Sequence, residues 1–159
     1  SAARTGAVPG VAARHLARKD SQVITVLGCG QINRSCLRSI ATQLPNLKKV
    51  ICYDIFEAAA KKFLDWEKQE LGIDGEVILD LEAAVKEADV ITVAASRLKP
   101  LYVKDEWMKE GVTVLITGPM QTDDSFWMST KLIMTMYAYM KLMSRKLLSP
   151  ATLPDITKG

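Results

Sequence analysis

Blocks of apolar residues alternate along the chain with blocks of mixed apolar and polar residues. Four apolar runs rich in β-branched residues predict strands buried on both faces, at Gln22–Leu27, Lys49–Tyr53, Val90–Ala94 and Val112–Thr117. A weaker strand candidate spans Glu76–Leu79.

Helical spacing of apolar residues falls between these runs. It predicts helices at Pro9–Ala17, Gln31–Leu44, Glu57–Leu71, Leu81–Ala88 and Tyr137–Leu148. Asp80 is the expected N-cap of the fourth helix. Lys104–Lys109 fits one helical turn, and Thr130–Met134 fits either a strand or a helix.

Strands that alternate with helices in this way indicate βαβ units. The predicted fold class is therefore α/β: a Rossmann-like, doubly wound, mostly parallel sheet with helices on both faces. We expect residues 1–159 to form a single dinucleotide-binding domain.

The composition is that of a globular protein, with 48% hydrophobic and 25% charged residues and a net charge of +3. These values exclude intrinsic disorder, and no uncharged apolar stretch is long enough to predict a membrane span. The basic residues are scattered rather than clustered with aromatic residues, so we expect no nucleic-acid partner.

Cysteines are few and irregularly placed. Cys29, Cys36 and Cys52 are odd in number, and their spacing fits neither a disulfide framework nor a zinc site. We therefore expect no metal and a reducing, cytoplasmic compartment. Cys29 lies in a turn that opens a helix, an environment that lowers a thiol pKa, but no base partner is evident.

The glycine turn, Gly28–Cys29–Gly30, directly follows the first predicted strand and opens a helix. Gly28 suits a tight turn, and Gly30 lets a pyrophosphate approach the backbone. The phosphates would lie at the helix N-terminus, where N–H groups and the helix dipole favour anions. The same turn can also form without any ligand.

Asp54 ends the second strand, 24 residues after Gly30. An acid at this place binds the ribose hydroxyl pair and repels a 2′-phosphate, so NAD is preferred over NADP. Asn33 stands where glycine or alanine is usual. Either the helix stands slightly off the sheet, or the Asn33 side chain contacts the cofactor.

Small residues follow the next two strands. Ala94-Ala95-Ser96 leave room for adenine and ribose, although simple packing explains them nearly as well. Gly118 ends the last strand on the same edge, near the expected nicotinamide.

Together these segments resemble the central part of the ornithine cyclodeaminase/mu-crystallin family. The likeness is carried by Arg4-Thr5-Gly6-Ala7, the glycine turn, Arg34–Arg38, Asp54, Glu82–Val85, Ala88-Asp89-Val90 and Ala94–Leu101. The resemblance implies a NAD-binding domain taken from a two-domain, homodimeric parent whose other domain binds substrate. It also implies that Arg4 contacts the substrate carboxylate and that Thr5 lies near the cofactor phosphates.

One departure concerns the chemistry. Met120 and Asp124 occupy the positions where cyclodeaminases carry an Asp and a Lys, and methionine cannot transfer a proton. We therefore expect the parent to be a NAD-dependent oxidoreductase or deaminase acting on an amino or imino acid, and we assign no catalytic residue. Asp123 and Asp124 are tempting substitutes, but adjacent acids in a loop are usually solvated.

Two alternatives remain: a non-catalytic, mu-crystallin-like ligand-binding module, and an interaction domain that uses a methionine-rich face at Met134–Met143. The residues expected to bind the cofactor are Thr5, Gly28, Gly30, Gln31, Ile32, Asn33, Asp54, Ala94, Ala95, Ser96 and Gly118.

Overall fold

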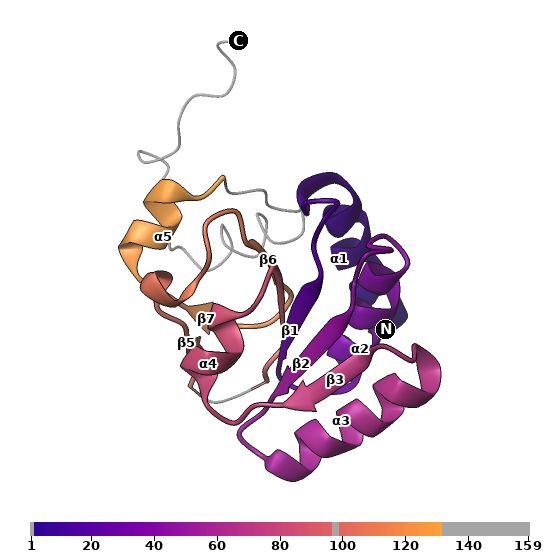
Figure 1. Ribbon diagram of the computed structural model, residues 1–159. Coiled ribbons are helices and arrows are strands. Elements are labelled where there is room, and N and C mark those ends of the chain that lie inside the picture. The colour runs from indigo at the N-terminus through magenta and orange to yellow at the C-terminus, as the bar shows by residue number, and fades with distance from the viewer. Residues whose placement is uncertain (1, 97–98, 132–159) are drawn as a thin grey trace. The chain divides into compact units, whose positions relative to one another are not determined.

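The computed structural model describes residues 2–96 and 99–131 (Figure 1). Two compact units divide the chain, Ser1–Asp123 and Asp124–Gly159. The second unit contributes helix α5, Asp124–Ser129, to the described part. The expected helix at Tyr137–Leu148 and the methionine-rich face lie outside the described residues, and the single domain over residues 1–159 stays a prediction.

The first unit is built on five parallel strands in the order β3-β2-β1-β4-β6. This is the predicted Rossmann-like fold class. The strands are β1 Val23–Leu27, β2 Lys49–Tyr53, β3 Asp74–Val77, β4 Val90–Val93 and β6 Thr113–Ile116. The helices are α1 Ala2–Leu16, α2 Gln31–Ala41, α3 Glu57–Glu70, α4 Leu81–Lys86 and the short 3₁₀ turn η1 Asp105–Trp107.

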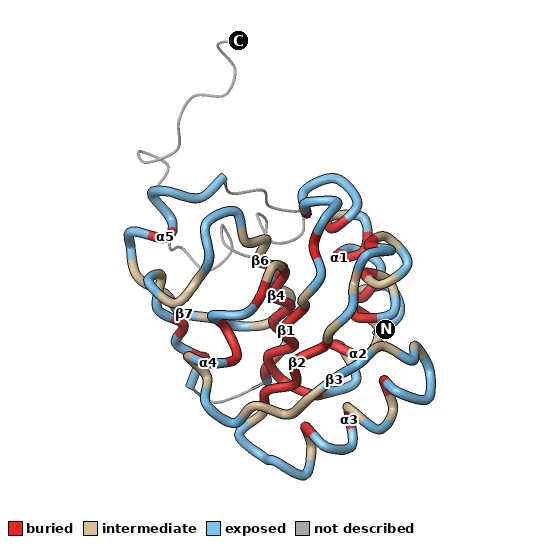
Figure 2. The backbone as a smooth tube through the Cα atoms, viewed as in Figure 1, coloured by how far each residue is buried: buried red, intermediate tan, exposed pale blue. Residues whose placement is uncertain are grey.

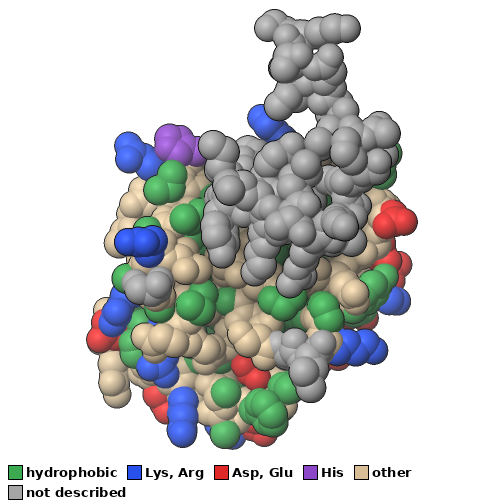
Figure 3. Space-filling view, turned by 180° about the vertical axis from the view of Figure 1, so that it is seen from behind, with side chains coloured by type: hydrophobic (Ala, Val, Ile, Leu, Met, Phe, Trp, Pro, Cys, Tyr) green, Lys and Arg blue, Asp and Glu red, His purple; other side chains and the backbone are tan. Residues whose placement is uncertain are grey.

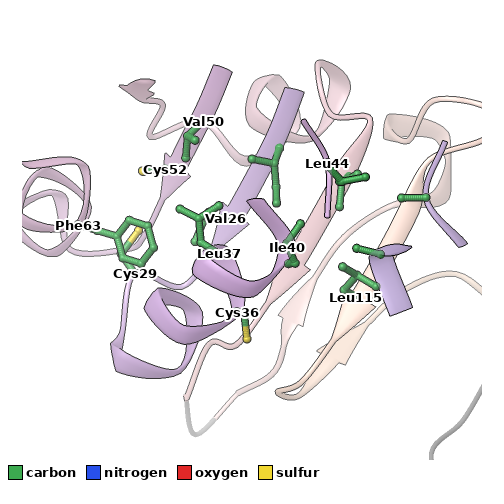
Figure 4. Packing of buried hydrophobic residues seen from close by; sticks show 14 of the residues in the cluster. Val26, Cys29, Cys36, Leu37, Ile40, Leu44, Val50, Cys52, Phe63 and Leu115 are labelled. Carbon is green, nitrogen blue, oxygen red and sulfur yellow. The ribbon is translucent and has the colours of Figure 1, made fainter. Parts of the chain in front are cut away.

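Both faces of the sheet are covered, so its central strands β1, β2 and β4 are buried except at the first residue of β1 and of β2 (Figure 2). On one face, side chains of α1, α2 and α3 pack with Val26, Val50 and Cys52, as Figure 4 shows for α2 and Phe63 of α3. On the other face, Ala84 and Val85 of α4 pack with the alternate strand residues. Burial on both faces explains why these strands are continuous apolar runs.

Helix α1 begins seven residues earlier than the predicted Pro9–Ala17 and includes Pro9. The cause is its packing on α2. A Cβ at Gly6 would lie 2.4 Å from Ser35 Cβ, and one at Gly10 would lie 2.7 Å from Ser39 Cβ. Local helix propensity carries no information about this contact between two helices, so the sequence pattern did not predict the first seven residues of α1.

Three short elements were not predicted: the parallel pair β5 Leu101–Tyr102 and β7 Met120–Gln121, and α5. Two residues of strand are too short for a periodic signal. Strand β3 lies two residues before the predicted Glu76–Leu79. No helix among the described residues is long and apolar enough to cross a membrane.

Charges of both signs are interspersed on the part of the surface visible in Figure 3. Within residues 2–96 and 99–131, no group of three or more His, Cys, Asp or Glu side chains could hold a metal ion. All three cysteines are buried and unpaired.

Candidate functional site

The three glycines predicted to serve the cofactor differ in what surrounds them. Gly28 has φ +91°, and a Cβ there would lie 2.8 Å from Ala95 Cα. A Cβ at Gly118 would lie 3.0 Å from Ala94 Cα. At Gly30 a Cβ would meet nothing within 4 Å. Gly28 and Gly118 therefore serve close backbone packing, and Gly30 is the one beside open space.

The Ala94-Ala95 backbone is accordingly enclosed between two loops at the carboxyl edge of the sheet. Ala94 N–H donates to Leu27 O at 3.0 Å, and Gly118 N–H donates to Val93 O at 3.0 Å. Small side chains at Ala94 and Ala95 thus fit the packing explanation left open above. Ser96 is exposed at the same edge.

Helix α2 begins at Gln31, and the N-cap residue before it, Gly30, has an extended backbone and makes no side-chain capping hydrogen bond. The helix has eleven residues, so its first N–H groups and its dipole present a partial positive charge at the open space over Gly30. Gln31 is exposed there and Ile32 is half-buried. This arrangement suits a phosphate group.

Asp54 is half-buried and accepts two backbone hydrogen bonds. Cys29 N–H donates to its Oδ2 at 2.8 Å, and Phe56 N–H donates to its Oδ1 at 3.1 Å. The carboxylate is therefore fixed against the glycine turn, and each oxygen keeps a lone pair for a further donor.

Asn33 is fully buried, and both ends of its amide are used within the protein. Its Nδ2 donates to Leu27 O at 3.0 Å and to Gly28 O at 2.7 Å. Its Oδ1 accepts a hydrogen bond from Thr92 Oγ1 at 2.9 Å. The side chain thus holds the turn and the sheet together, and it does not extend toward the open space over Gly30.

Arg4 and Thr5 reach the same edge through the packing of two helices. Gly6 faces Ser35 and Gly10 faces Ser39, so α1 and α2 run parallel. Their N-termini therefore lie at the same end, the carboxyl edge of the sheet, where α2 begins. Arg4 is exposed and Thr5 is half-buried.

The Cys29 thiol was expected to have a lowered pKa, and this expectation is wrong. A hydrogen bond with the Cys52 thiol, followed by burial, raises the pKa of Cys29 far above its usual value. The thiol also lies 3.5 Å from Tyr53 O (the neighbourhood is visible in Figure 4). The side chain is part of the core.

The side chains of Met120 and Asp123, which follow β6, make contacts within the protein. Met120 is half-buried in β7 and packs against the core. The Asp123 carboxylate accepts hydrogen bonds from the Tyr102 hydroxyl and, at 2.8 Å, from Asp105 N–H. The same two donors lower the pKa of Asp123. Asp123 therefore links the end of β7 to β5 and η1 by hydrogen bonds, and its carboxylate is not simply solvated in a loop.

Sequence reasoning overlooked an apolar surface beside Asp54. Ile55, Phe56 and Leu79 are 53%, 67% and 51% exposed. Ile78 N–H donates to Cys52 O, which continues the β2-β3 register and brings Leu79 level with Asp54. The sequence signal for this surface was the pair of apolar residues, Ile55 and Phe56, directly after Asp54. The surface suits a flat, weakly polar ring.

Comparison with known proteins gives a consistent set of matches. The family model described as "Ornithine cyclodeaminase/mu-crystallin family" matches residues 1–142. N-((2S)-2-amino-2-carboxyethyl)-L-glutamate dehydrogenase of Staphylococcus aureus is 31% identical over 115 residues, covering 72% of this chain and 34% of that protein. The chain spans about a third of the length of the curated relatives it matches.

Two solved structures are similar as well. One is Δ1-pyrroline-2-carboxylate reductase of Thermococcus litoralis in complex with NADH and L-proline, at 33% identity and a TM-score of 0.71, covering 76% of this chain and 38% of that one. The other is an archaeal alanine dehydrogenase dimer with bound NAD, at 33% identity and a TM-score of 0.73, covering 82% and 41%.

Proposed function

This chain belongs to the ornithine cyclodeaminase/mu-crystallin family, and from that premise we propose that it carries the NAD(H)-binding domain of a longer oxidoreductase. The substrate class is an amino or imino acid, as in the relatives named dehydrogenases and reductases. The parent is a homodimer in this proposal, in line with the dimeric archaeal relative.

The open space over Gly30 at the start of α2 is the observation that carries the proposal. The pyrophosphate would lie there, with the backbone N–H groups of Gln31, Ile32 and Asn33 directed at it. Asp54 would accept the ribose hydroxyls, and its charge would repel a 2′-phosphate. Ile55 and Leu79 would cover one face of the adenine.

The bound nicotinamide would supply hydride transfer. Thr5 would lie near the phosphates and Arg4 would hold the substrate carboxylate, since both belong to the α1 end at this edge. Gly118 would border the nicotinamide, and Ser96 would lie beside the adenine and ribose. No catalytic acid or base is assigned to this chain.

A pair of glycine variants tests the proposal by calorimetric titration with NADH and NADPH. Gly30→Ala meets no neighbour within 4 Å, so we expect normal folding and a loss of NADH affinity of about tenfold or more from contact with the phosphates. An alanine at Gly10, outside the proposed site, crowds Ser39 on α2, so Gly10→Ala should lower stability more than affinity. Wild-type chain that binds neither nucleotide at millimolar concentration, or Gly30→Ala that binds as wild type, would refute the site.

A second function, ligand binding without turnover, is favoured by Met120. A thioether at this place cannot move a proton, and its side chain packs against the core. The longer parent should then bind NADH but consume none of it when Δ1-pyrroline-2-carboxylate is added. Oxidation of NADH in that assay would decide for the oxidoreductase.

A further inference from the structure

One peptide bond of the glycine turn is held at both ends by side chains. The Gly28 carbonyl oxygen accepts a hydrogen bond from Asn33 Nδ2 at 2.7 Å, and Cys29 N–H donates to Asp54 Oδ2 at 2.8 Å. We propose that Asn33, acting through this peptide, is a positioning residue for the Asp54 carboxylate and so helps set the preference for NADH over NADPH. The inference rests on the proposed function and assigns Asn33 a role without cofactor contact.

The orientation of the Asn33 amide is fixed by its partners. Leu27 O and Gly28 O are both acceptors, so the nitrogen must face them. The Thr92 hydroxyl then donates to the amide oxygen at 2.9 Å. Because Asn33 and Gly28 are both buried, removing the Asn33 side chain leaves the Gly28 carbonyl in the protein interior without the donor that lies 2.7 Å from it.

The other end of the peptide determines the plane of the carboxylate. Asp54 is held by two N–H groups, that of Cys29 on Oδ2 and that of Phe56 on Oδ1. If the Gly28–Cys29 peptide rotates to find a new partner for its carbonyl, the Cys29 N–H leaves Oδ2. One bond then remains, and the carboxylate can turn about it.

A carboxylate that can turn loses the paired contact with two ribose hydroxyls. It also turns away from a 2′-phosphate, so the repulsion of NADPH weakens. These effects are opposite for the two nucleotides, whereas a general loss of stability lowers the affinity for both equally. The ratio of the two dissociation constants therefore separates positioning from a merely structural role.

The experiment compares Asn33→Ala with Thr25→Val by titration with NADH and NADPH. Thr25 is a matched control because it is also fully buried, lies on β1, and its hydroxyl donates to a backbone carbonyl, Ala84 O, at 2.7 Å. In Asn33→Ala we expect the NADPH-to-NADH ratio of dissociation constants to fall about tenfold, as for one buried hydrogen bond. In Thr25→Val the ratio should not change.

Two further variants sharpen the result. Thr92→Val leaves both Nδ2 bonds in place and should keep the wild-type ratio. In the double variant Asn33→Ala/Asp54→Ala, the NADPH-to-NADH ratio of dissociation constants should be no lower than in Asp54→Ala, because the carboxylate that Asn33 positions is absent from both. If Asn33→Ala does not fold, Asn33→Ser keeps one donor and should show a smaller fall. An unchanged ratio in the folded Asn33 variant, or a full additional fall in the double variant, would overturn the proposal.

A readout without nucleotide keeps this inference distinct from the proposed function. Hydrogen exchange of the Cys29 N–H, measured by NMR, should quicken about tenfold or more in Asn33→Ala and stay as in wild type in Thr25→Val. If wild type binds no nucleotide, the proposed function fails, while quickened exchange still supports the peptide linkage. Unchanged exchange of Cys29 overturns the linkage whatever the titrations give.

Discussion

An aspartate from a neighbouring strand lies near each end of β1: Asp54 follows β2, Asp89 precedes β4, and the two are held differently. At the carboxyl end, Asp54 accepts the N–H groups of Cys29 and Phe56. At the amino end, Asp89 accepts those of Gln22 and Val23, at 2.9 and 3.1 Å. Asp89 also has two cations, Arg18 at 3.2 Å and Lys109 at 3.3 Å, whereas Asp54 has no ion pair within the described part of the chain.

The difference teaches how the same backbone contact can serve two purposes. Burial by itself raises the pKa of Asp89, but the N–H groups of Gln22 and Val23 and the Lys109 ammonium outweigh it and hold the pKa below its usual range. The charge of Asp89 is fully compensated inside the protein. The charge of Asp54 is positioned by two N–H groups but has no cation beside it in the described part of the chain, as the proposed ribose contact requires.

Asp89→Ala should have the largest effect and only on stability. It leaves the N–H groups of Gln22 and Val23 without their acceptor and removes one partner each from Arg18 and Lys109, so we expect a loss of about 2 kcal/mol in the free energy of unfolding. Urea denaturation measures it. NADH titration of the folded variant should give the wild-type dissociation constant; a weakened constant would end the distinction between the two ends.

Asp54→Ala should have the opposite result, a small effect on stability and a large effect on the affinity for NADH. The turn loses one acceptor at a half-buried position, so the free energy of unfolding should fall by only about 1 kcal/mol. The affinity for NADH should fall about tenfold or more, with the loss confined to NADH when NADPH is titrated in parallel. A stability loss as large as that of Asp89→Ala would mean that Asp54 is a structural residue as well.

Acid should weaken the amino end of β1 through Asp89. Because the pKa of Asp89 is lower in the folded than in the unfolded state, its stabilisation is complete above its ordinary value of 3.8. It is lost as pH falls from there through the folded value. Asp89→Asn should remove this part of the pH dependence, measured as denaturation midpoints across the acid range; a slope identical to wild type would contradict the assignment.

Glu67 is a third acidic residue that accepts a backbone N–H group, and its substitution should have the smallest effect of the three at neutral pH. Its Oε1 accepts Ile73 N–H at 3.0 Å and its Oε2 has no partner. Burial, with a contribution from Asp74, raises the pKa of Glu67 above 4.5. Stability is therefore complete below that ordinary value and lost as pH rises through the folded one.

Glu67→Gln keeps the acceptor for Ile73 and cannot ionise. It should match wild type in acid and become more stable than wild type as pH rises, by about 1 kcal/mol once Glu67 is charged. Thermal denaturation at a series of pH values follows the difference. A constant offset at every pH would show that packing rather than ionisation separates the two proteins.

Much of this fold could be predicted because its strands are buried on both faces. Strands β1, β2, β4 and β6 lie within about one residue of the predicted runs, and Asp80 caps α4 through Ala83 N–H at 2.7 Å. The extension of α1 could not be predicted, because it depends on contact between Gly6 and Ser35, residues far apart in the chain.

The candidate site was predicted in outline and not in detail. The glycine turn and Asp54 follow from local spacing. Which glycine faces open space, and that the Asn33 amide turns inward to Gly28 O and Thr92, depend on contacts across the sheet. The contact of Asn33 with Thr92 alone joins residues 59 positions apart, beyond the reach of a pattern read along the chain.

Gly30 has a consequence for how sequences of this kind drift. An alanine there disturbs no neighbour, so folding alone places no restriction on the position, whereas Gly28 is restricted by its backbone angle and by Ala95. In the proposed nucleotide site, contact with the phosphates would then be the force that favours glycine at position 30. In a lineage that abandons the nucleotide, Gly30 should be substituted early and Gly28 should persist, which makes the pair a molecular record of whether binding was kept.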